Sequence, residues 1–114
     1  MRESNYSKSR VLFTEGLLLA RDLGAVLTIY WSLAGLGALE LTESRPEQAA
    51  TLFGATEALR EARSIQPPPA WQAELDAEVA SAQAQLHGEA WDNAWAEGYT
   101  MTLEAAIMFA LSFR

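Results

Sequence analysis

Carboxylates and one histidine are the side chains of this sequence that are suited to acid–base or metal chemistry. Glu74, Asp76 and Glu78 recur along one stretch, and His87 is the single histidine. We expect the three carboxylates to point to different sides of a helix and to stay solvated, so that they do not converge on a metal ion. His87 stands in a His-Gly step that breaks a helix, which favours an exposed turn residue over a general base.

What the sequence lacks restricts the chemistry further. It has no cysteine, which excludes thiol nucleophiles, disulfides and Fe–S clusters, and it has no Glu-x-x-His pair for a helical di-metal site. The glycines of Gly35-Leu36-Gly37 are not followed by Gly-Lys-Ser/Thr, so they do not form a phosphate loop. The sequence therefore predicts no enzyme, no metal and no cofactor. An enzyme acting through Asp or Glu requires two carboxylates buried together in a cleft.

Four tryptophans are the most unusual feature of the composition. Their expected role is packing between helices, because each ring offers a large apolar surface. The alternative is a Trp-lined cavity, which would make the chain a helical domain that senses a small molecule. The four residues are Trp31, Trp71, Trp91 and Trp95.

The charge balance and the hydropathy pattern limit the classes of partner. Eight basic residues stand against fifteen acidic ones, and seven of the acids lie in residues 64–114 with a single arginine. Such a chain repels nucleic acid, so no direct nucleic-acid partner is expected.

An uncharged stretch over residues 23–39 is barely long enough to span a bilayer, and it contains three glycines. We expect it to lie in a protein core rather than a membrane, in a cytoplasmic protein whose polar N-terminus is no signal peptide.

Apolar residues recur at helical spacing along the whole chain, and β-strand signals are nearly absent. Gly24 predicts a left-handed helix end, Thr102 predicts a helix start, and Gly35 and Gly37 predict close approach between helices. Six helices on short connections indicate a single all-α domain over residues 1–114. Gly98 is expected to cap the fifth helix. The six expected helices cover residues 7–23, 25–41, 46–63, 69–86, 89–97 and 102–113.

Residues 30–63 resemble one tetratricopeptide repeat, a unit of two antiparallel helices. Leu36-Gly37 matches the Leu-Gly pair of its first helix, Ala49 the small residue where the helices cross, and Phe53 the large residue four positions later. The resemblance implies a degenerate repeat followed by capping helices over residues 67–114, in a tetratricopeptide-like antiparallel array. The sequence departs from the repeat at Leu33, Glu40, Thr56 and Glu61.

A wider resemblance covers residues 10–111. The run over residues 45–61, the later Ala94-Trp95-Ala96-Glu97-Gly98, and Thr102 to Ala106 are similar to the C-terminal tetratricopeptide-like region of large bacterial signalling ATPases and LuxR-type transcriptional regulators. That resemblance implies a non-catalytic interaction or sensing module related to a bacterial regulator in signal transduction. It implies neither nucleotide binding nor DNA binding by these residues.

The resemblance also implies a place for a protein or peptide partner. Repeat arrays bind partners on a concave surface lined by first helices. In this register the groove-facing positions are Trp31, Ala34, Ala38 and Leu41. The alternative is that the C-terminal helices fold back and bury them.

The first helix carries more apolar surface than one neighbour can cover. Its two stripes predict either a two-fold homodimer or coverage by the C-terminal helix over residues 102–113, because large aliphatic side chains are costly to leave in water. The candidate self-association residues are Val11, Leu12, Leu18 and Leu19, and the second stripe is Phe13, Leu17 and Ala20.

Overall fold

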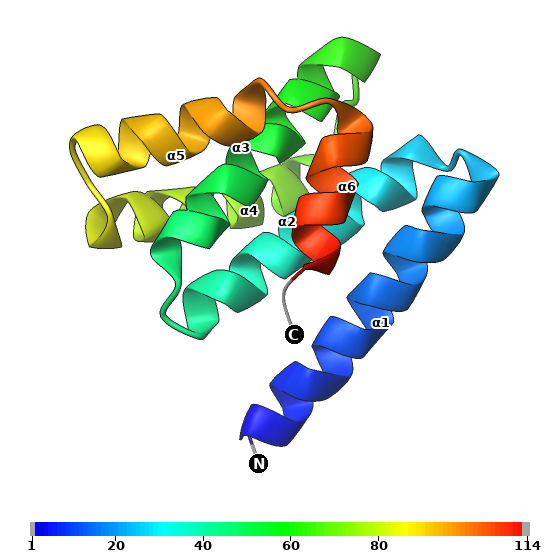
Figure 1. The fold of residues 1–114 in the computed structure, drawn as a ribbon, viewed down its shortest axis with the longest axis horizontal. Helices are drawn as coiled ribbons and strands as arrows, with labels where there is room; N and C mark the ends of the chain where they lie inside the picture. The colour runs from blue at the N-terminus through cyan, green and yellow to red at the C-terminus, as the bar shows by residue number, and fades with distance from the viewer. Residues whose placement is uncertain (1, 113–114) are drawn as a thin grey trace.

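The chain is all-α, as the sequence predicts. The computed structural model describes residues 2–112, with side chains from residue 8 onward, and this part contains six helices and no strand (Figure 1). The six are α1 (Arg2–Leu23), α2 (Val26–Thr42), α3 (Pro46–Arg63), α4 (Pro69–Gln85), α5 (Glu89–Tyr99) and α6 (Leu103–Leu111).

Most helix boundaries follow the expected signals. Gly24 adopts a left-handed φ of 70° directly after α1. Pro46 and Pro69 are the first residues of α3 and α4, where a proline loses no helical hydrogen bond. The Thr102 hydroxyl accepts a hydrogen bond of 3.1 Å from the backbone N–H of Ala105 and caps α6.

The start of α1 and the end of α5 differ most from the expected boundaries. α1 begins at Arg2, several residues before the expected start, and the expected end of the sixth helix at Phe113 lies outside the described residues. The prediction that Gly98 caps α5 is wrong, because Gly98 is buried inside a helix that continues to Tyr99. Its role is close packing rather than termination.

The prediction that Gly35 and Gly37 mark close approach is confirmed, and an aromatic ring fills the space at each. A Cβ at Gly35 would overlap the ring of Phe13 from α1, and one at Gly37 would overlap the ring of Phe53 from α3. Backbone-to-backbone approach occurs elsewhere, at Gly98, where a Cβ would overlap the carbonyl oxygen of Thr51. Glycine is required there because α5 lies directly on α3.

The helices pack around α2 and α3. α2 contacts α1 on one side and α3 on the other, and α3 packs most extensively against α5 (Figure 1). α6 returns to the crossing of α2 and α3, whereas α4 is held loosely and has Ala82 as its one buried residue. α4 therefore leaves part of α2 uncovered on the side where the two helices diverge.

A buried carboxylate joins the first three helices. The Glu40 side chain has no exposed surface, and its oxygens lie 2.8 Å from Nη2 of Arg10 in α1 and 2.5 Å from Nε of Arg45 in the α2–α3 connection. Glu43 binds the same two arginines. The hydrogen bond to Glu40 raises the pKa of Arg45 above its ordinary value. The cluster is electrically balanced, with two arginines and two glutamates.

Substituting Gly98 tests the close packing of α5 on α3. Gly98→Ala should lower the free energy of unfolding by about 1–3 kcal/mol, because the added methyl group overlaps the Thr51 carbonyl and pushes the helices apart. Gly16→Ala is the matched control: the nearest atom to the new Cβ is Oγ of Ser32 at 3.7 Å, and the helical propensity of alanine should raise stability by about 0.5–1 kcal/mol. Urea unfolding followed by circular dichroism measures both. Effects of the same sign would contradict the packing.

Candidate functional site

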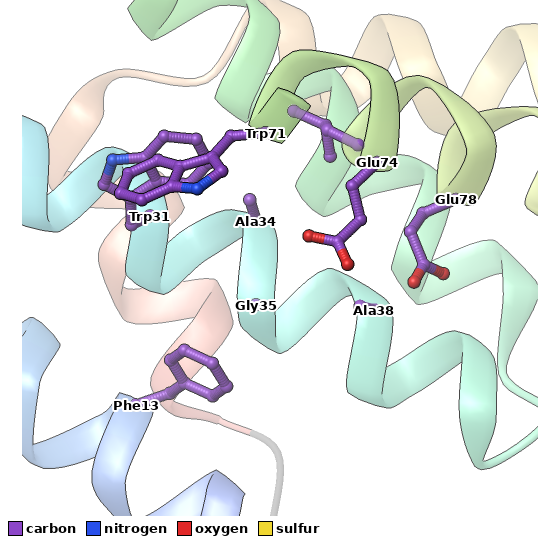
Figure 2. Close-up of a pocket in the computed structure, with 9 residues that line it drawn as sticks. Phe13, Trp31, Ala34, Gly35, Ala38, Trp71, Glu74 and Glu78 are labelled. Carbon is purple, nitrogen blue, oxygen red and sulfur yellow. The ribbon is translucent and has the colours of Figure 1, made fainter. Parts of the chain in front are cut away.

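A hollow of about 350 Å³ lies between α1, α2 and α4. It forms where α4 diverges from α2, and Phe13 of α1 closes the opposite side (Figure 2). Its volume falls in the range of small-ligand pockets, and its walls are mainly apolar. We call it the α2–α4 pocket, and its lining residues are Phe13, Trp31, Ala34, Gly35, Ala38, Trp71, Glu74, Leu75 and Glu78.

Two tryptophans form one end of the α2–α4 pocket. The rings of Trp31 and Trp71 meet edge to face, with centroids 4.7 Å apart and planes at 84°. Trp71 thus packs between α4 and α2, as the sequence predicts, but it is 50% exposed and lies at the edge of the core. The indole N–H of Trp31 is buried and has no hydrogen-bond acceptor among the described residues. A buried donor without an acceptor is uncommon, because it forfeits the hydrogen bond it had in water.

Two carboxylates lie on the α4 wall of the same pocket. Figure 2 shows Glu74 and Glu78 extending from α4 toward α2, with Glu74 nearer the tryptophan pair and Glu78 farther along α4, above Ala38. Residues four apart share a helix face, so the expectation that the acids of α4 point to different sides is wrong for these two. Burial, and to a smaller extent the charge of Glu74, raises the pKa of the Glu78 carboxyl. Asp76 lies apart and accepts a hydrogen bond from Gln72.

The structure brings together three of the four predicted groove residues. Trp31, Ala34 and Ala38 line the α2–α4 pocket, and all three come from α2. Leu41 is buried in a separate apolar cluster with Phe53 and Trp91, so it does not face this pocket.

The predicted groove left out the pocket residues that come from α1 and α4. Trp71, Glu74 and Glu78 share one face of α4, and their spacing of three and four is visible in the sequence. Phe13 reaches the pocket because its ring occupies the space, or notch, left by the missing side chain of Gly35. This contact joins two helices, so no local sequence pattern predicts it.

The four predicted self-association residues form an exposed stripe on α1. Val11, Leu12 and Leu19 are each more than half exposed, and Leu18 is also exposed. The second stripe faces inward, where Leu17 and Ala20 are buried. The expectation that the C-terminal helix covers the first stripe is wrong, because α6 packs on the inner side of the bundle and leaves these residues in solvent.

The described residues contain no group of three His, Cys, Asp or Glu side chains placed to hold a metal ion. His87 is exposed at the break between α4 and α5, as the sequence predicts. None of the described helices combines the length and apolar character needed to cross a membrane: the uncharged stretch over residues 23–39 is divided between α1 and α2 by the turn at Gly24.

Comparisons of this chain with protein-family models, with curated proteins and with solved structures give no significant match. Function is therefore inferred from the α2–α4 pocket and from the residues that build it.

The raised pKa of Glu78 predicts a pH-dependent effect on stability. A carboxyl whose pKa is higher in the folded state contributes stability below its unfolded value, about pH 4.3, and that contribution is lost as the pH rises through the folded value. Glu78→Gln should therefore be more stable than the parent chain at pH 7, and the difference should vanish at about pH 3.5.

Urea unfolding at the two pH values measures this effect. Glu97→Gln, at an exposed position of α5, is the matched control and should change stability little at either pH. A Glu78→Gln variant that is less stable than the parent at pH 7 would contradict the assignment.

Proposed function

We propose that the chain is a non-catalytic interaction module that binds part of a protein or peptide partner in the α2–α4 pocket. The observation that carries this proposal is the half-exposed Trp71 beside Trp31 at the end of an open, apolar hollow. Partly exposed tryptophans are typical anchors of binding sites, because they bury a large area at little cost in conformational entropy. Through the tetratricopeptide-like resemblance, we propose a bacterial, cytoplasmic regulator as the context of the module.

The arrangement of polar groups favours binding over catalysis. Glu74 and Glu78 are neighbours on one wall, Glu74 is exposed, and no carboxylate faces them from α1 or α2 among the pocket residues. A pair that flanks a reacting bond needs groups on two sides of it. The pocket residues also include no hydroxyl, imidazole or amine to act as nucleophile or base.

A small-molecule sensor is the second candidate. A volume of about 350 Å³ is sufficient for a small organic ligand, and the two tryptophans would report its binding through their fluorescence. This function uses the same pocket, so the two candidates differ in the ligand and not in the site.

Filling the pocket tests the peptide-binding function. Peptides selected from a displayed random library against the whole chain should bind Ala38→Leu at least about tenfold more weakly, because the longer side chain occupies the pocket. Ala80→Leu is the matched control on the exposed side of α4 and should bind like the parent. Fluorescence titration gives the dissociation constants. Equal affinity for the two variants, or failure to select any peptide, would contradict the proposal.

We also propose that the exposed stripe of α1 pairs with a second copy of the chain. Sedimentation velocity at micromolar concentration should give the mass of a dimer, and Leu12→Glu with Leu19→Glu should give a monomer, because charges placed in an apolar interface oppose association. A monomeric parent chain whose double variant is equally stable would contradict pairing.

A further inference from the structure

The carboxylates of the α2–α4 pocket have no cationic partner among the side chains that the structure describes. Neither Glu74 nor Glu78 forms an ion pair within the described residues. Two of the three helices that line the pocket, α2 and α4, contain no lysine or arginine. Arg10 of α1, the helix that contributes Phe13, is engaged with Glu40 and Glu43. A half-buried negative charge therefore faces an apolar hollow without compensation.

The aromatic walls add a second preference for positive charge. The face of an indole ring attracts a cation, and two such rings form the end of the pocket nearer to Glu74. The rest of the lining is apolar, which suits the methylene stem of a long basic side chain. A carboxylate or phosphate ligand would meet like charge in the same space.

We propose that the α2–α4 pocket receives a lysine or arginine side chain of a peptide partner, with an apolar residue next to it in the peptide. The basic head group binds Glu74 and Glu78, its stem lies along the faces of Trp31 and Trp71, and the neighbouring apolar side chain packs near Phe13. This inference rests on the proposed peptide-binding function and names the chemistry that the pocket selects.

The charge preference is measured with three matched peptides and the whole chain. The probes are Ac-Ala-Phe-Lys-Phe-Ala-NH2 and the same peptide with norleucine or glutamate in place of lysine. Titrations followed by the backbone amide signals of α2 and α4 should give binding of the lysine peptide about tenfold tighter than that of the norleucine peptide, and weakest binding for the glutamate peptide.

Matched variants assign the preference to the pocket. In a chain carrying Glu74→Gln and Glu78→Gln, the preference for lysine over norleucine should fall below about twofold, with the norleucine affinity unchanged. A chain carrying Asp92→Asn and Glu97→Gln, at exposed positions of α5, has the same net charge and should retain the preference. Equal loss in both variants would overturn the proposal, because it would show a general charge effect.

The remaining outcomes separate this inference from the proposed function. Equal binding of the lysine and norleucine peptides to the parent chain would overturn the inference and leave peptide binding intact. The chain could instead bind 2-phenylethylammonium, added as a free cation, but not the lysine peptide. This result would overturn the inference that the cation belongs to a peptide, and it would favour the sensing function. Failure of the peptides to bind, together with failure of the library selection, would remove the proposed function itself.

Discussion

The buried carboxylate of Glu40 is the constraint on which the arrangement of the first three helices depends. A fully buried charge is tolerated only with close and well-placed partners, and Glu40 has two, Arg10 and Arg45. These arginines come from α1 and from the α2–α3 connection, so satisfying Glu40 fixes both segments. Removing one member of such a cluster leaves the others desolvated and unpaired. The positions of the three helices therefore depend on one another.

The pocket follows from that constraint. With α1 held against α2, the ring of Phe13 fits the notch at Gly35 and becomes one side of the α2–α4 pocket. On the other side α4 has little burial of its own, so Trp71 and Glu78 extend over the hollow instead of into the core. The site thus combines one firmly held wall with one loosely packed wall, an arrangement suited to admitting a side chain from a partner.

Local signals determined how much of the structure could be predicted from the sequence. Helical spacing, prolines and the cap at Thr102 gave the all-α class and most boundaries, because each acts within a few residues. The resemblance of residues 30–63 to a tetratricopeptide repeat predicted three of the pocket residues, Trp31, Ala34 and Ala38, which all lie on one helix. Pairings over long sequence distances, such as Arg10 with Glu40, were not visible. Position 40 was noted only as a departure from the repeat, and the structure shows that its carboxylate is an ion-pair centre.

A crystal structure of the chain with the lysine peptide Ac-Ala-Phe-Lys-Phe-Ala-NH2 tests the central claim most directly, since it locates every group at once. The account predicts the lysine Nζ within hydrogen-bonding distance of the Glu74 or Glu78 carboxylate, about 2.7–2.9 Å, with its stem against Trp31 and Trp71. Phe13 should remain in the Gly35 notch. A peptide bound on another surface, or a pocket closed by movement of α4 onto α2, would contradict the account.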